Sequence, residues 1–288
     1  MPPKNIIDRT IEDWLKRNPS LIATDPFLST QKPGLGLLTP KYFDTMPEPF
    51  WGSTKNNLAV IIHLNPGFTD APNKHGYPAD NVVLSRTNMA PFLASGYSAY
   101  ADRFPQLCPS PLHQASSDWW LSKMKWLDSI VYLRNGYRNT YTHSSIDNKN
   151  YPNLRPFALE IVPWHSNNWS QAKYSAGQIS WMQNVVIPLA VAALKGSKLD
   201  FILMLGNNAQ LCSVLNYMGF VKLNSWDDSK TPLSPYWPQK NGVPTHQNFI
   251  VWDHPQYGVK LLNMIANCSK PPRSDFNPFL KNVVFPTI

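Results

Sequence analysis

The sequence predicts an α/β fold, a three-layer α/β/α sandwich with a central, mainly parallel four-stranded sheet. Four short and continuous apolar runs lie far apart in the chain, at residues 58–64, 157–162, 201–205 and 249–252. Helical patterns separate them, at residues 119–133, 179–194 and 208–218. A continuous apolar run is typical of a strand covered on both faces, and the strand–helix–strand order favours parallel pairing through right-handed crossovers.

The chain of 288 residues is interpreted as one domain with two extensions. Residues 1–55 are expected to form a helix, with Ile7, Ile11 and Trp14 at helical spacing, followed by an irregular segment rich in Pro and Gly. Residues 56–268 form the α/β/α domain, with a long insertion around 85–155. Residues 269–288 form a C-terminal tail.

Composition narrows the class of protein. The formal charge of +8 and the pI of about 9.3 favour polyanionic partners such as nucleic acid. Three widely spaced cysteines, at positions 108, 212 and 268, argue against a disulfide framework and against a zinc or iron–sulfur site. The first residues lack a signal-peptide core, and no run reaches eighteen apolar residues. We expect a cytoplasmic protein, or a nuclear one in a eukaryote, that does not enter a membrane.

Polar segments follow the four apolar runs. In an open parallel sheet, ligands bind beyond the carboxyl ends of the strands, so these segments are the first candidates for a site. They read LNPGF, EIVPWHS, GNNAQ and DHPQY. Each one alone is an ordinary loop sequence, but together they indicate a shared functional edge.

Three of these segments resemble motifs of one enzyme family, the uracil-DNA glycosylase superfamily. The LNPG sequence around Asn65 resembles the first motif of its mismatch-specific and single-strand-selective branches. The segment LMLGNNAQ, residues 203–210, is similar to the third-strand segment, and His254-Pro255 resembles the start of the last motif. The resemblance extends over about residues 56–268.

The resemblance implies a monofunctional DNA glycosylase, which flips a base out of DNA and hydrolyses its N-glycosidic bond to leave an abasic site. Asn65 falls on the catalytic asparagine that orients water, and His254 would stabilise the leaving base. Neither motif contains a lysine that could form a Schiff base, so no lyase step is expected. The implied partner is DNA, with no cofactor, no metal and no obligate protein partner, and we expect a monomer.

The resemblance also implies a base-binding pocket. Tyr77 would stack on the flipped base, His165 would contact the nucleotide or a phosphate, and Tyr257 stands near the intercalating wedge. Gln256 replaces the family's serine after His-Pro, which puts the usual grip on the DNA backbone in doubt. The full set of predicted substrate-binding residues is Pro66, Gly67, Phe68, Tyr77, Glu160, His165, Ser166 and Tyr257.

Glu160 is the most informative departure from the family, because uracil-reading relatives carry an asparagine on the strand that it resembles. An ionised carboxylate only accepts hydrogen bonds, which favours the exocyclic amine of cytosine. Together with the long insertion, this points to a modified cytosine, such as phage DNA contains, and to a role in antiviral defence. The alternative is that Glu160 forms a buried ion pair with an arginine, such as Arg155.

Two other functions stay open at this stage. The altered His-Pro loop is compatible with a protein that binds a modified base in DNA without cleaving it. An N-glycosidase that acts on free nucleosides or nucleotides would need neither a DNA groove nor a wedge.

Overall fold

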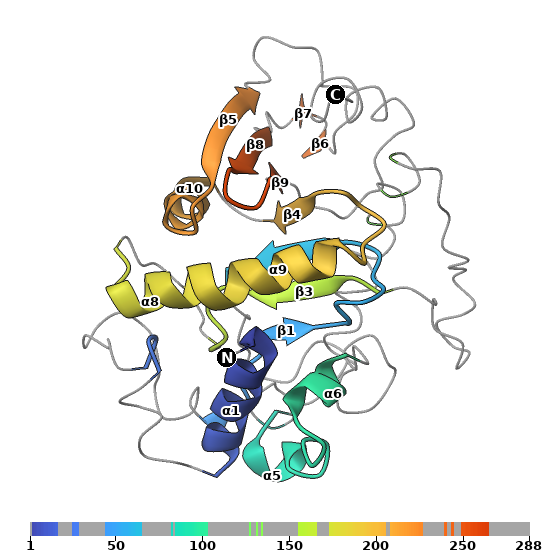
Figure 1. The fold of residues 1–288 in the computed structure, drawn as a ribbon, viewed down its shortest axis with the longest axis vertical. Helices are drawn as coiled ribbons and strands as arrows, with labels where there is room; N and C mark the ends of the chain where they lie inside the picture. The colour runs from blue at the N-terminus through green and yellow to red at the C-terminus, as the bar shows by residue number, and fades with distance from the viewer. Residues whose placement is uncertain are drawn as a thin grey trace.

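The computed structural model describes residues 2–16, 25–28, 44–64, 82, 84–102, 127, 131, 134, 155–165, 173–205, 208–226, 239–240, 243–244 and 249–264. A mixed seven-stranded sheet forms its centre, with the strand order β1-β3-β2-β4-β9-β8-β5 (Figure 1). The strands are β1 (Phe50–Trp51), β2 (Val60–His63), β3 (Phe157–Glu160), β4 (Ile202–Leu205), β5 (Val221–Trp226), β8 (Phe249–His254) and β9 (Val259–Met264). A separate two-stranded sheet pairs β6 (Gln239–Lys240) with β7 (Val243–Pro244).

The middle of the sheet is parallel, which confirms the α/β class. Strands β3, β2, β4 and β9 are neighbours, and each pairs in parallel with the next. Strand β1 adds to β3 in the antiparallel direction, and β8 and β5 extend the other side as antiparallel strands. The sheet therefore has seven strands in place of the predicted four.

The fourth predicted strand, residues 249–252, was placed wrongly in the parallel set. It lies in β8, which runs antiparallel to β9 and joins it through a tight turn. The amide N–H groups of Tyr257 and Gly258 both donate to the carbonyl of His254, at 3.1 and 2.8 Å, and Gly258 has a φ of 61°. The fourth parallel strand is β9. It was not predicted from the sequence, because Lys260 and Asn263 interrupt its run of apolar residues.

The helices are α1 (Pro3–Leu15), α5 (Arg86–Met89), α6 (Tyr97–Ala101), α8 (Ala176–Trp181), the π-helical turn η3 (Met182–Val186), α9 (Ile187–Leu194) and α10 (Asn208–Tyr217). The expected N-terminal helix is confirmed by α1, which buries Ile7, Ile11 and Trp14. The helix predicted at 119–133 lies mostly outside the described residues, although Leu127 and Val131 within it are helical and buried.

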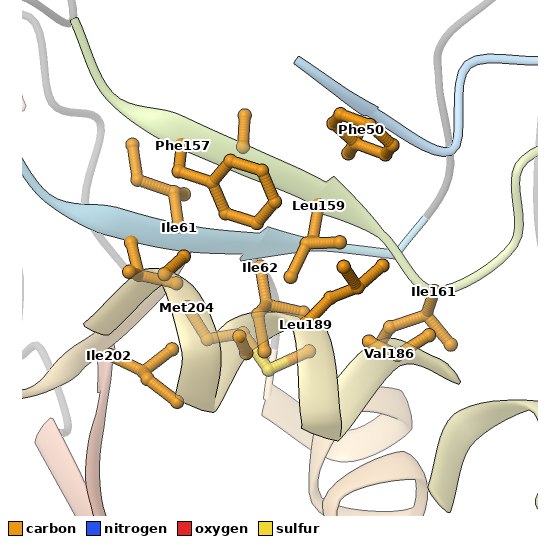
Figure 2. Close-up of a cluster of buried hydrophobic side chains, with 14 of the residues drawn as sticks. Phe50, Ile61, Ile62, Phe157, Leu159, Ile161, Val186, Leu189, Ile202 and Met204 are labelled. Atoms are coloured by element: carbon orange, nitrogen blue, oxygen red, sulfur yellow. The ribbon is translucent and has the colours of Figure 1, made fainter. Parts of the chain in front are cut away.

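Helices α8 and α9 and the turn between them cover one face of the parallel strands. Figure 2 shows Leu189 of this helical run near Ile62 and Met204 of the sheet, and Val186 near Ile161, which follows β3. The widened turn η3 directly precedes α9, whose second residue is Pro188. Proline has no N–H and its ring clashes with the carbonyl four residues earlier, and a wider turn relieves both problems.

The same helical run, residues 176–194, is long and apolar enough to cross a membrane by length and composition alone. Half of an 18-residue window of this run is buried within the protein, as in the core helix of a globular domain. It begins with a capping box, in which Ser175 Oγ accepts from the Gln178 N–H at 3.2 Å and Gln178 Oε1 accepts from the Ser175 N–H at 2.9 Å.

The end of α9 is packed tightly against the segment that leads into β2. Asn57 joins the two, since its N–H donates to the Gly196 carbonyl at 3.0 Å and its side-chain amide donates to the Ala193 carbonyl at 2.9 Å. A Cβ atom added at Gly196 would lie 2.4 Å from the backbone oxygen of Lys55. Only glycine fits at this contact.

We predict that Gly196→Ala lowers the free energy of unfolding by about 2 kcal/mol or more, because backbone must move to admit the methyl group. Urea unfolding monitored by tryptophan fluorescence measures the loss. The matched control is Gly177→Ala in α8, where the added Cβ lies 3.4 Å from the Pro26 side chain. Alanine there should be neutral or stabilise the helix by up to about 1 kcal/mol. Equal effects from the two variants would contradict the prediction.

Candidate functional site at the carboxyl edge of the sheet

The carboxyl ends of the parallel strands lie along one edge of the sheet, which we call the carboxyl edge. His63 ends β2 and pairs in register with Glu160, which ends β3. Beyond the sheet, Ile161 N–H donates to the His63 carbonyl at 3.0 Å and Val162 N–H to the Leu64 carbonyl at 2.9 Å. The two chains therefore stay side by side up to the residue that precedes Asn65.

A third segment, residues 46–49, lines the other side of the same chain. Glu160 N–H donates to the Pro49 carbonyl at 3.0 Å, and Glu48 N–H donates to the Pro163 carbonyl at 2.8 Å. These two bonds bring the main chain at residues 48 and 160 together, and the charge of Glu48 acts on the Glu160 carboxyl. Two carboxyl groups thus belong to one buried cluster at the carboxyl edge.

Glu48 is held in place by two donors. Its Oε2 accepts from the Trp51 indole N–H at 2.6 Å, and its Oε1 lies 3.0 Å from His165 Nε2. The same His165 nitrogen lies 3.1 Å from the carbonyl of Met46. Both neighbours of this nitrogen are acceptors, so Nε2 carries a hydrogen. Both oxygens of the buried Glu48 carboxylate consequently face donors.

Glu160 is placed differently. It is half-buried as a residue, but its Oε2 atom is buried and has no hydrogen-bond partner among the residues that the structure describes. Burial raises the pKa of the Glu160 carboxyl well above its usual value, and the charge of Glu48 raises it further. These two causes favour the protonated form of Glu160, which has one O–H donor and one carbonyl acceptor.

Tyr97 of α6 closes the cluster on another side. Its hydroxyl donates to the Phe50 carbonyl at 2.6 Å, and its ring packs edge-on against Phe50 at 5.4 Å. Burial raises the pKa of Tyr97 well above 10, and the charge of Glu48 raises it further. Tyr97 thus stays a neutral donor beside the two carboxyl groups.

Arg155, the example given for an arginine that pairs with Glu160, does not form this pair. Arg155 precedes the amino end of β3, where its carbonyl accepts from the Leu58 N–H at 2.9 Å, whereas Glu160 ends the strand. Five extended residues separate them, which is about 17 Å along the strand. The charged neighbour of Glu160 is another carboxylate and not a guanidinium.

His254 does not lie at the carboxyl edge. In the antiparallel pair of β8 and β9, Phe249 pairs with Met264 at the carboxyl edge, and His254 pairs with Val259 at the opposite edge. The distance along the strand is again about 17 Å. The expectation that the His-Pro segment joins the other strand ends is therefore wrong, and its cause is the antiparallel direction of β8.

The surroundings of His254 give it a packing role. Its Nε2 lies 3.1 Å from the Met218 carbonyl, and its ring contacts the rings of Phe220 and Tyr257 at centroid distances of 5.0 and 4.9 Å. Gly219, with a φ of 92°, lets the imidazole approach, since a Cβ there would lie 3.1 Å from Nε2. Tyr257 is exposed beside His254, so these two predicted site residues share an edge with each other but not with Glu160.

The outcome for the predicted site is mixed. Glu160 and His165 come together through Glu48, whereas His254 and Tyr257 lie at the other edge. The remaining predicted residues, Asn65, Pro66, Gly67, Phe68, Tyr77 and Ser166, lie outside the described residues. Within the described ranges, no three side chains of the types that bind metals come together.

Sequence reasoning missed Glu48, Trp51 and Tyr97. Glu48 offered a signal, because it is one of only three glutamates in the chain and follows a proline in the segment MPEPFW. Nothing in the pattern indicates that this segment lies beside the end of β3, since more than 100 residues separate the two.

Asp25 is a second buried acid near the cluster. Its Oδ1 accepts from the N–H groups of Phe27 and Leu28, at 2.8 and 3.0 Å, and from the Trp164 indole N–H at 3.3 Å. Burial raises the pKa of Asp25 to about 6, although these three bonds oppose the shift. The folded protein thus holds a proton that the unfolded chain releases near pH 4.

We predict that Asp25→Asn stabilises the protein at pH 7. The protonated Asp25 contributes fully to the free energy of unfolding below pH 3.8. This contribution is lost as pH rises to about 6, because the carboxyl group ionises at lower pH in the unfolded chain than in the folded protein. At about 1.4 kcal/mol per pKa unit, the loss is about 3 kcal/mol, and asparagine keeps an Oδ1 for all three donors. Urea unfolding from pH 4 to pH 8 measures it. Asp8→Asn is the control, because Asp8 Oδ1 accepts from the Ser98 N–H at 2.7 Å at the start of α6, where a negative charge is favourable. A flat difference between wild type and Asp25→Asn across this range would refute the prediction.

We also predict that His254→Ala lowers the free energy of unfolding by about 1–3 kcal/mol, because it empties the space between Phe220 and Tyr257. Thermal unfolding followed by circular dichroism gives the change. Gln256→Ala, an exposed position in the same turn, should leave stability within about 0.5 kcal/mol of wild type. A fully stable His254→Ala protein would show that the packing role is wrong.

Comparison with known proteins finds no family model, curated protein or solved structure that matches this chain. The resemblance to the uracil-DNA glycosylase superfamily therefore rests on the short motifs, and function must be inferred from them together with the cluster around Glu160.

Proposed function

We propose that the protein is a DNA glycosylase, which flips a target base out of DNA and hydrolyses its N-glycosidic bond to leave an abasic site. The observation that carries this proposal is the buried Oε2 of Glu160 at the carboxyl edge, which has no hydrogen-bond partner among the described residues. It is paired in register with the end of β2, the strand that leads into the LNPG motif. The proposed base-reading group thus ends one strand, and the neighbouring strand is followed in the sequence by the LNPG motif.

The buried Oε2 of Glu160, without a hydrogen-bond partner among the described residues, is energetically unfavourable. Leaving a buried polar group without a hydrogen bond costs about 1–3 kcal/mol, and most such groups in folded proteins are satisfied. A ligand that reaches the carboxyl edge would supply the missing partner. A flipped base presents donors and acceptors along its edge, and enzymes that act on bases bind the extruded base in a pocket of this kind. The net charge of +8 favours DNA as the ligand.

The protonation state of Glu160 bears on the target base. A neutral carboxyl group can accept from the exocyclic amine of cytosine while its O–H donates to the adjacent ring nitrogen. An ionised carboxylate could satisfy only the amine. We favour cytosine or a modified cytosine as the target, including the bulky forms in phage DNA, which would make the protein an antiviral defence enzyme.

The finer architecture is also part of the proposal. The crossover from β3 to β4 runs through α8 and α9 on one face of the sheet. The connection from β2 to β3 moves across the sheet in the opposite direction, so a right-handed crossover puts it on the opposite face. Buried helical residues within this connection, Leu127 and Val131, support a second helical layer and hence a three-layer sandwich.

A second candidate is a protein that reads a base in DNA without cleaving it. The specific observation in its favour is the place of His254, which is at the opposite edge from Glu160 and so cannot stabilise a leaving base there. A glycosylase must find that stabilisation among other groups at the carboxyl edge.

The test is mass-spectrometric detection of free bases released from three kinds of DNA: uracil-containing, mismatched and cytosine-modified phage DNA. We predict release from the modified-cytosine DNA, and a loss of about 100-fold or more in Asn65→Ala because the attacking water is no longer oriented. Asn216→Ala, an exposed position on α10, is the matched control and should retain activity. Tight DNA binding with no base released from any substrate would instead support the binding protein.

A further inference from the structure

We propose that Glu160 is the proton donor to the leaving base and that Glu48 is the positioning residue that keeps this proton on Glu160. The inference rests on the proposed glycosylase function and deepens it. It assigns to Glu160 the stabilisation of the leaving base, which His254 cannot provide from the opposite edge. It also narrows the substrate to bases that leave poorly without a proton.

The geometry of the two carboxyl groups decides which of them carries a proton. Both oxygens of Glu48 face donors, the Trp51 indole and His165 Nε2, so a proton on Glu48 would displace one of these contacts. Glu160 has in the same cluster an oxygen, Oε2, that no donor among the described residues contacts. Two neighbouring carboxyl groups resist ionising together, and the one with fewer donors keeps the proton.

The other groups around Glu160 leave this assignment unchanged. Its titratable neighbours are His63 on β2, Glu48 before β1 and Tyr97 on α6, and His165 after β3 contacts Glu48. Tyr97 is neutral and already donates to Phe50. Among the described residues, no lysine or arginine contributes to the electrostatics of Glu160, while Glu48 does.

The step balances without any further reagent. Water forms a bond to the sugar C1′, and the C1′–N bond breaks with its electron pair going to the base. The O–H proton of Glu160 moves to the base, and the proton lost by the water passes to solvent. Solvent then returns a proton to Glu160, and the net products are the free base and an abasic site.

The need for a proton donor depends on the base. Uracil leaves as an anion whose charge spreads over two carbonyl oxygens, so it departs without protonation. Cytosine has one carbonyl and an amine in place of the second, so its anion is less stable and protonation helps it more. General acid catalysis contributes about 100-fold to 10,000-fold to such steps. A buried neutral acid therefore suits cytosine and its modified forms better than uracil.

The protonation state can be measured directly, because the chain has only three glutamates, Glu12, Glu48 and Glu160. Selective ¹³C labelling of the glutamate carboxyl carbons gives three NMR signals, which single Glu→Gln variants assign. We expect the Glu160 signal of the wild-type protein to report a neutral acid at pH 7. We expect its titration to move to lower pH in Glu48→Gln, since the like charge is gone. An ionised Glu160 at pH 7 in the wild type would overturn the proposal.

Base release supplies the second arm, with cytosine-modified and uracil-containing DNA as substrates. Glu160→Gln keeps a neutral side chain that can bind the base edge but cannot give up a proton. We expect it to lose about 100-fold or more in release of modified cytosine and much less in release of uracil. Glu12→Gln, an exposed residue of α1 that pairs with Lys16, is the control and should match wild type.

The pH profile separates proton donation from simple binding. Release by the wild type should fall as pH rises through the pKa of Glu160, and in Glu48→Gln this fall should begin at lower pH. Release by Glu160→Gln at the wild-type rate would overturn the donor role while leaving the glycosylase function standing. If the wild-type protein releases no base from any DNA, the glycosylase function fails and the donor role fails with it.

Discussion

The parallel pairing of β2 with β3 on one side and β4 on the other is the constraint on which the rest of the molecule depends. All three strands are buried at their centres, and the helices that connect or cover them pack on this unit. Parallel direction puts the carboxyl ends of the strands at one edge, and the ladder continues beyond His63 and Glu160 as main-chain bonds. The candidate site exists because three segments, 46–49, 60–64 and 157–165, stay in contact after the strands end.

Two buried acids near this edge show how differently the fold treats the same group. Asp25 receives three hydrogen bonds to one oxygen, which offset part of the cost of its burial. Glu160 has a buried oxygen with no partner among the described residues and a carboxylate as its charged neighbour. The first arrangement is what a structural acid needs. The arrangement around Glu160 is unfavourable for folding, and it becomes favourable when a bound ligand supplies the missing hydrogen bond. The functional proposal therefore rests on Glu160.

Local patterns predicted much of this fold and less of the site. The helix at the N-terminus and the strands β2, β3 and β4 followed from the spacing and continuity of apolar residues. The direction of β8 did not, because a continuous apolar run is the same in either direction and the turn after His254 sets the outcome. Glu160 was found because a carboxylate in an apolar strand is conspicuous. Glu48 was not, because its role comes from a contact across the chain that no local pattern encodes, and the region around Asn65 lies outside the described residues.

The hairpin of β8 and β9 has a consequence for how the protein folds. Trp252 pairs with Leu261 only nine residues away, whereas Ile61 of β2 pairs with Ala158 of β3 across 97 residues. The entropy lost on closing a loop rises with its length, so the hairpin can form early and the β2–β3 pair is among the slower contacts to form. The carboxyl edge depends on that slow pairing. A chain that stalls during folding would therefore already contain its C-terminal hairpin while the pieces of the site were still apart.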